Sequence, residues 1–265
     1  MTIKTRNKIF LSCLIFIILI VVVFIVSSFL FIRVIDIKAN LAPLFGTQNP
    51  QFNIMGNALL LFFSLASSIL FYRFFRKTSS AEIFFFYMFI FLTALESLKI
   101  LTLGIEYLTL PFQWTVIASR LFYAMHIMGI LCLFTSSLFA CRLKYQYLES
   151  ALGICFLVSL FLTPFMPLNT ANFDANRLFS LALRQEFFTA FLIIELFAVF
   201  NYFYAAKLNS NANYYLTALG LALVYAGKEM LFLSGGLSIT LIGFFSLSLG
   251  TIIFATRTHE IYLWF

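Results

Sequence analysis

The sequence predicts an all-α integral membrane protein, a single bundle of about eight transmembrane helices. Of its 265 residues, 63% are hydrophobic and 10% are charged, whereas soluble domains average about 45–50% and about 25%. The mean hydropathy is +1.02. The apolar residues gather in runs of about 20, the length that crosses a bilayer as a helix. These observations exclude a soluble globular protein and leave no room for a catalytic domain outside the membrane.

The expected helices follow from the apolar runs and from the segments between them. The first run is preceded by Lys4, Arg6 and Lys8 and exceeds the roughly 7–15 residues of a signal-peptide core, so we expect a retained helix. Prolines and charges then predict a loop over 33–54, and another loop is expected over 167–186. The last two runs are separated by three residues, which predicts a tight helical hairpin. The eight helices are expected at about 9–31, 55–72, 83–105, 113–140, 151–166, 187–205, 213–233 and 237–256.

The distribution of lysine and arginine predicts that both ends of the chain are cytoplasmic. Cytoplasmic segments of membrane proteins are enriched in these residues. With the N-terminus inside, the inner segments hold ten bases and the outer segments four, Arg33, Lys38, Arg177 and Arg184. The inner bases are Lys4, Arg6, Lys8, Arg73, Arg76, Lys77, Arg142, Lys144, Lys207 and Arg257. We therefore expect a protein of the cytoplasmic membrane whose longer loops lie outside, where binding loops often occur.

Several classes of function find no support in the sequence. The bases mark the ends of apolar runs and form no patch for nucleic acid, and membrane lipid is the expected surrounding. The four cysteines lie in or beside apolar runs without the spacing of metal ligands, so we expect packing thiols. We find no motif for a cofactor, a metal or a catalytic triad, and we expect a protein that is not an enzyme. The cysteines are Cys13, Cys132, Cys141 and Cys155.

Charged side chains inside the apolar runs are the strongest functional signal. A central Arg, Lys or Asp costs about 2.5–3.5 kcal/mol on insertion scales, so such groups normally face the bundle interior or a wet cavity. In the expected topology these charges lie near the middle or in the outer third of the third, fourth, sixth and seventh helices. Thr93, Glu96, Lys99, Thr102 and Glu106 recur every three or four residues and predict one polar stripe. The candidate ligand-binding residues are Glu96, Lys99, Arg120, Tyr123, His126, Glu195, Tyr225, Lys228 and Glu229.

Three interpretations of this expected cluster stay open. Three carboxylates balance three bases, so the groups can form an ion network that only fixes helix packing. Alternatively, they line a pocket open to the outside for a small polar or zwitterionic ligand, with Arg120 or Lys99 meeting its anionic group. A proton or ion relay through Glu96, His126 and Glu195 is the third interpretation.

The segment 83–145 resembles the seven-helix sensor regions of bacterial membrane receptors, which are fused to histidine kinases or cyclase-type output domains. The resemblance is carried by Ala94-Leu-Glu-Ser-Leu-Lys-Ile through Tyr107, by Trp114, by Arg120-Leu-Phe-Tyr123, and by the helix that ends at Cys141-Arg142. It implies ligand sensing at the outer face by helices two to eight, with helix one as an addition. Because the sequence ends at Phe265, soon after the last helix, we expect signalling through a partner protein. The alternative function is a small secondary transporter or a transporter subunit.

Overall fold

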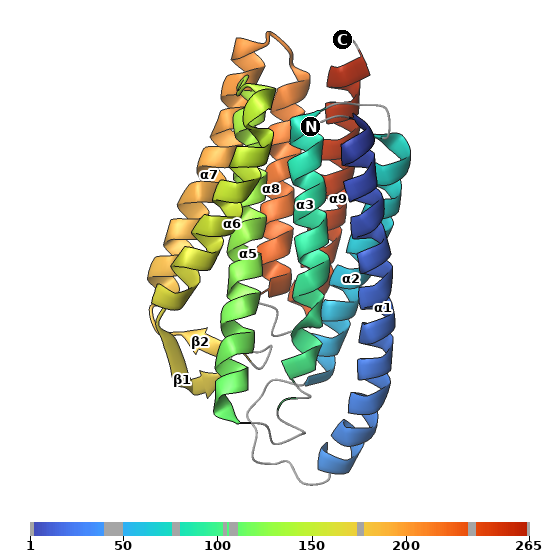
Figure 1. Ribbon diagram of the computed structural model, residues 1–265, viewed down its shortest axis with the longest axis vertical. Helices are drawn as coiled ribbons and strands as arrows, with labels where there is room; N and C mark the ends of the chain where they lie inside the picture. Colours follow the sequence, from blue (N-terminus) through green and yellow to red (C-terminus); the bar gives the residue numbers. More distant parts are fainter. Residues whose placement is uncertain are drawn as a thin grey trace.

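In a computed structural model, the chain forms one helical bundle with a small β-hairpin at one end (Figure 1). The structure describes residues 3–39, 50–75, 80–102, 105, 111–173, 178–232 and 237–263. Within these ranges, eight helices are long and apolar enough to cross a membrane, which confirms the expected number. The first of them begins and the last ends at the same end of the bundle, here called the terminal end, and the hairpin lies at the opposite end.

The helix boundaries agree with the apolar runs in the centre and extend beyond them at several ends. Both α1 and α9 are longer than expected, because polar residues at their ends continue the helix. The expected third helix narrows to a 3₁₀ turn, η1, after Glu96, and its end at 103–104 lies outside the described residues. The tight turn expected at 234–236 also lies outside them. The helices are α1 (Ile3–Ala39), α2 (Pro50–Phe74), α3 (Ala81–Glu96), η1 (Ser97–Ile100), α5 (Phe112–Ala140), η2 (Tyr145–Tyr147), α6 (Leu148–Phe165), α7 (Arg184–Leu208), α8 (Asn213–Phe232) and α9 (Leu237–Leu263).

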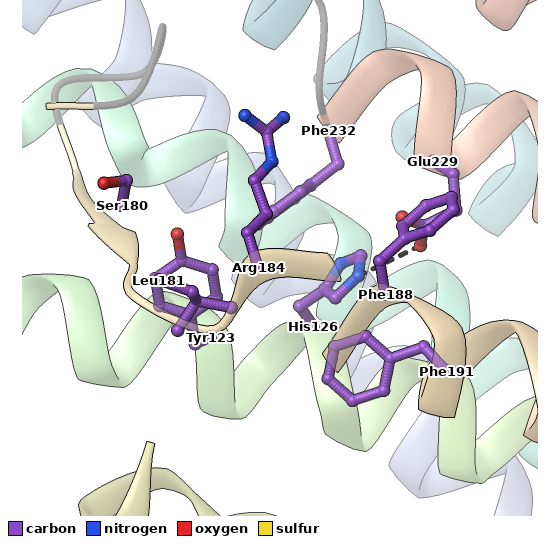
Figure 2. A pocket seen from close by; sticks show the side chains of 9 residues that line it. All are labelled: Tyr123, His126, Ser180, Leu181, Arg184, Phe188, Phe191, Glu229 and Phe232. Carbon is purple, nitrogen blue, oxygen red and sulfur yellow. Dashed lines mark ion pairs between the residues drawn. The ribbon is translucent and has the colours of Figure 1, made fainter. Parts of the chain in front are cut away.

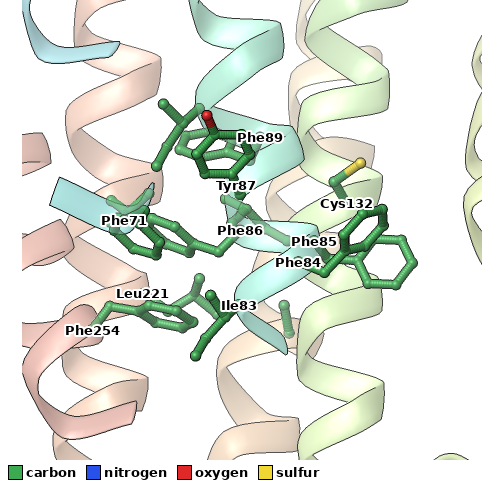
Figure 3. Packing of buried hydrophobic residues seen from close by; sticks show 14 of the residues in the cluster. Phe71, Ile83, Phe84, Phe85, Phe86, Tyr87, Phe89, Cys132, Leu221 and Phe254 are labelled. Atoms are coloured by element: carbon green, nitrogen blue, oxygen red, sulfur yellow. The ribbon is translucent and has the colours of Figure 1, made fainter. Parts of the chain in front are cut away.

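The helix α3 lies at the centre of the bundle. Most of its residues are apolar and nearly all of them are buried, as expected of a helix surrounded by other helices. Phe86 stacks on Phe71 of α2 at 5.3 Å and on Phe254 of α9 at 4.1 Å between ring centroids (Figure 3). Its neighbour Tyr87 donates a hydrogen bond to the carbonyl oxygen of Phe10 in α1. This phenylalanine-rich layer joins four helices in the terminal half of the bundle.

The helices α8 and α9 pack closely because glycines on both of them face each other. A Cβ atom added at Gly227 would lie 2.6 Å from the carbonyl oxygen of Gly243, and one added at Gly250 would lie 2.6 Å from that of Gly220. These are backbone atoms, which cannot move aside like the end of a side chain. The close packing of α8 against α9 therefore depends on glycine at these positions.

A short antiparallel hairpin occupies part of the expected loop 167–186. Its strands are β1 (Leu168–Phe173) and β2 (Phe179–Leu181). On α5, the hydroxyl of Ser119 accepts a hydrogen bond from the backbone N–H of Phe179, and the hydroxyl of Tyr123 donates one to its carbonyl oxygen. The hairpin corrects the expected loop, since these two contacts hold it against α5 as an ordered cover.

Candidate functional site

Buried ionisable groups from three helices meet in one network near the middle of the bundle. The ammonium Nζ of Lys228 in α8 lies 3.0 Å from Oε1 of Glu96 in α3, and both side chains are 1% exposed. His126 in α5 lies between two carboxylates. Its Nδ1 is 3.7 Å from Oε1 of Glu96, and its Nε2 is 3.0 Å from Oε1 of Glu229 in α8. The network thus connects α3, α5 and α8 by charge.

A glycine makes room for the lysine of this network. A Cβ atom at Gly129, one turn after His126 on α5, would lie 2.5 Å from Nζ of Lys228. The ring of Phe89 in α3 lies under the same ammonium, 5.0 Å from it to the ring centroid. Gly129 therefore allows Lys228 to reach Glu96 between two packed helices.

The 3₁₀ turn after α3 positions a second lysine beside the network. Lys99 lies in η1, is buried, and holds its ammonium 3.8 Å from the ring centroid of Phe232. Such an ammonium is attracted to the negative face of the ring, and its charge also stabilises the carboxylate of Glu96. The imidazole of His126 stacks on Phe232 at 4.0 Å. Short 3₁₀ stretches inside helices often mark functional positions, and this one places Lys99 toward the cluster.

A small pocket reaches the network from the hairpin end (Figure 2). Its volume is about 40 Å³, room for a few water molecules at about 10–15 Å³ each. The ion pair between His126 and Glu229 forms one wall, and Arg184 stands at the start of α7 beside β2. The remaining lining is mostly aromatic. The lining residues are Tyr123, His126, Ser180, Leu181, Arg184, Phe188, Phe191, Glu229 and Phe232.

Most of the candidate residues are brought together. Glu96, Lys99, His126, Lys228 and Glu229 form the network itself, and the polar stripe from Thr93 through Thr102 is buried, although Glu106 lies outside the described residues.

Three further candidates differ in their roles. Tyr123 lines the pocket, whereas Tyr225 is buried and donates a hydrogen bond of 3.4 Å to the carbonyl oxygen of Ile130. Glu195 on α7 is half-buried and interacts electrostatically with Glu229 and His126. Its Oε1 has no hydrogen-bond partner among the described residues. We place Glu195 at the edge of the network.

Arg120 does not belong to the cluster, which corrects the expectation. Its side chain is exposed. Six residues separate it from His126, and at about 3.6 residues per turn this spacing puts the two side chains about 120° apart around α5. Arg120 and His126 lie on the same helix at similar depths, but their side chains point to different faces of it. Arg184, assigned from the sequence only to an outer loop, is the arginine that lines the pocket.

A second buried carboxylate lies toward the terminal end. Glu82 in the first turn of α3 is 1% exposed and accepts a hydrogen bond of 2.8 Å from the hydroxyl of Tyr262 in α9. Fourteen residues separate it from Glu96, about 21 Å along the helix. Because the layer of Phe84, Phe85 and Phe86 lies between them, the two polar regions are separated by apolar packing (Figure 3).

Sequence reasoning missed Gly129, Arg184, Phe232 and Glu82. A single glycine in an apolar helix and one phenylalanine among 37 give no signal of their own. Glu82 had a signal, since Ser80 before it is a typical helix N-cap and an acidic residue in the first turn is favoured. The hydroxyl of Ser80 indeed accepts a hydrogen bond from the backbone N–H of Ile83.

No protein-family model, no curated protein and no solved structure matches this chain.

Proposed function

We propose that the chain is a multi-pass protein of the cytoplasmic membrane that acts as a receptor, or as the binding component of one, for a small polar ligand. The terminal end, which carries most of the bases, lies in the cytoplasm. The hairpin end lies outside and admits the ligand to the pocket. The observation that carries this proposal is the ion pair between Glu229 and His126, which lines the pocket and is linked through His126 to the buried pair of Glu96 and Lys228.

The chemistry of the pocket favours a compact ligand with a cationic group. Glu229 supplies a carboxylate, and the acidic side chain of Glu195 lies nearby. Aromatic rings of Phe188, Phe191 and Phe232 line the same space, and such rings attract ammonium groups. Arg184 takes the role first expected of Arg120 or Lys99, which is to meet an anionic group of a zwitterion.

Ligand binding would act by shifting helices against one another. A ligand biases such a shift only through its difference in affinity between the two arrangements, and contacts to α5, α7 and α8 provide that difference. At the terminal end, Arg142 after α5 donates a hydrogen bond of 2.8 Å to Asn209 after α7. A movement of α7 against α5 therefore changes the basic loops that face a cytoplasmic partner.

A ligand screen tests the proposal. Purified protein in nanodiscs is heated with amino acids and small amines, and we expect one compound class to raise the unfolding temperature with saturable dose dependence. This effect should be lost in Glu229→Gln and in Arg184→Gln and retained in Arg120→Gln, the matched control outside the cluster. If all three variants respond like the wild type, the pocket is not the binding site.

The second candidate is a secondary transporter, favoured by the alternation of carboxylate, imidazole and carboxylate from Glu96 through His126 to Glu229. The apolar layer of Phe84, Phe85 and Phe86, which lies between the network and Glu82, favours the receptor. Counterflow of a labelled ligand in liposomes separates the two, because a receptor binds without net uptake. Exchange of label that is abolished by Glu96→Gln would establish the transporter instead.

A further inference from the structure

Glu82 is a buried acid near the terminal end, outside the network described above. It is 1% exposed. Its Oε1 accepts the hydrogen bond from Tyr262, and its Oε2 has no hydrogen-bond partner among the described residues. Within the same parts of the chain, no ion pair includes this carboxyl group. An unpaired carboxylate is so unfavourable in a low-dielectric interior that such a group normally takes up a proton.

The ionisable groups that interact with Glu82 are themselves acids. They are the hydroxyls of Tyr202 on α7, Tyr214 on α8 and Tyr262 on α9, and the thiol of Cys141 after α5. Hydroxyl and thiol groups are uncharged in their protonated forms, so none of these groups neutralises a carboxylate.

The bases at the same end of the bundle make their described contacts with groups other than Glu82. Arg6 in α1 donates to the carbonyl oxygen of Phe75, and Arg142 after α5 donates to Asn209. On α9, Arg257 is paired with Glu260, and the ring of His259 contacts that of Phe75.

A proton fits this site better than a metal ion. In the part of the chain that the structure describes, no three His, Cys, Asp or Glu side chains are grouped so as to hold a metal ion. Hard cations take several oxygen ligands at once, whereas a proton needs one oxygen and no additional space.

Hydrogen bonds connect Glu82 to three other helices. The hydroxyl of Ser136 on α5 donates to its backbone carbonyl oxygen at 3.1 Å and lies 2.9 Å from the hydroxyl of Tyr202 on α7. Tyr262 belongs to the last turn of α9 and is only half-buried, which gives the carboxyl group a short route to water. A change of charge at Glu82 therefore acts where α3, α5, α7 and α9 meet.

We propose that Glu82 is a proton-binding site that responds to the pH on the side of the membrane that the terminal end faces. A proton from water adds to Oε2 and leaves a neutral carboxylic acid, while Oε1 keeps the hydrogen bond from Tyr262. When the proton leaves, the buried charge destabilises the contact between α3 and α9. The site is separate from the pocket and independent of the proposed receptor function.

Infrared spectroscopy of the whole chain in nanodiscs tests for the proton, because a protonated carboxylic acid has a carbonyl stretching band that a carboxylate lacks. We expect the wild type to show such a band, which disappears as the pH is raised and which is missing from Glu82→Gln. Glu149→Gln, which removes an exposed acid at the same end of the bundle, should keep the band. Wild-type and Glu82→Gln spectra that agree in this region at every pH would overturn the proposal.

Because Glu82→Gln can fail to fold, the band is also assigned in a variant that keeps the acid. Tyr262→Phe removes the donor to Oε1, and the loss of a hydrogen bond strengthens the carbonyl bond, so the band should move to higher frequency. Tyr215→Phe, at a tyrosine on α8 that is 40% exposed, should leave the band in place. An unchanged band in Tyr262→Phe would show that the proton belongs to another group.

Thermal unfolding measures the effect of the proton on stability. As the pH rises from the acidic range, the unfolded chain releases the proton of Glu82 before the folded chain does, so the wild type should lose stability relative to Glu82→Gln. A difference between the two that is constant with pH would contradict the proposal. Unfolding is also compared in sodium and choline chloride. If sodium raises the unfolding temperature of the wild type but not that of Glu82→Gln, the site takes a sodium ion and the assignment of a proton is wrong.

Discussion

The substitution Gly129→Ala perturbs the buried ion pair without removing any charge. The added Cβ would lie 2.5 Å from Nζ of Lys228 and 3.6 Å from the ring of Phe89. Non-bonded contacts are most favourable at about 3.5–4.0 Å, so the ammonium has to move by about 1 Å. The ring of Phe89 lies on the other side of the ammonium, so the displaced ammonium moves away from Glu96 and their contact weakens.

The expected loss of stability follows from the distance between the charges of Lys228 and Glu96 before and after the displacement. At an effective dielectric constant of about 20, two unit charges attract by about 5.5 kcal/mol at 3 Å and by about 4.2 kcal/mol at 4 Å. Lengthening the pair from its 3.0 Å therefore costs about 1.3 kcal/mol. Replacing a helical glycine by alanine contributes about 1 kcal/mol in the opposite direction, so the net change in Gly129→Ala is small.

The measurement therefore compares two alanine variants. Gly153 on α6 has no atom within 4 Å of an added Cβ, and Gly153→Ala should be stabilised by the helical preference alone. We expect the unfolding temperature of Gly129→Ala to lie below that of Gly153→Ala by about 3–5 °C, from about 1.3 kcal/mol at about 2–4 °C for each kcal/mol. In the background Glu96→Gln with Lys228→Met, which has neither charge, the two variants should match. Equal unfolding temperatures in the wild-type background would refute the reasoning.

Three further substitutions test other parts of the structure by thermal unfolding in the same detergent. Gly227→Leu should lower the unfolding temperature strongly, since the side chain meets the backbone of Gly243 and overpacking typically costs about 1–3 kcal/mol; a change no larger than that of Gly153→Leu would contradict the close packing of α8 and α9. Tyr262→Phe should destabilise by about 1–3 kcal/mol, because the buried carboxylate of Glu82 loses a donor, and wild-type stability would show that this hydrogen bond contributes nothing. Glu195→Gln should stabilise the ligand-free protein, mainly because it removes a carboxyl group whose ionised form is disfavoured by burial and also because it removes repulsion from Glu229, and a lower unfolding temperature would show that the Glu195 carboxylate is held by a favourable partner.

The number and order of the helices could be predicted from the sequence because the bilayer imposes one simple condition. A segment with no water around it has to satisfy its backbone within a helix, so each long apolar run in this chain becomes one. This condition does not determine where a helix ends when polar residues follow the apolar run. For this reason the predicted ends of α1 and α9 lie too close to the middle, and the sequence predicts a loop where the hairpin begins at Leu168.

The sequence predicts how deep in the bundle the site residues lie, but it does not predict the directions in which their side chains point. Counting residues from the ends of the apolar runs placed Glu96, His126 and Lys228 at similar levels, and the structure joins them. The same count placed Arg120 with them, although its side chain points elsewhere, because helix rotation depends on the packing of neighbouring helices. Gly129 is the clearest example of what the sequence does not predict, because its role depends on the absence of a Cβ atom.

The position of Arg120 also changes the charge balance of the cluster. The sequence suggested three carboxylates against three bases, a network that needs nothing from outside. Without Arg120, the acids Glu96, Glu195 and Glu229 lie with the bases Lys99 and Lys228, and Arg184 in the pocket lining supplies the third base. The wall of the pocket is the ion pair of His126 with Glu229. Because the third base lies on the pocket side of this ion pair and not inside the network, the charge balance of the site is completed at the place where a ligand would enter.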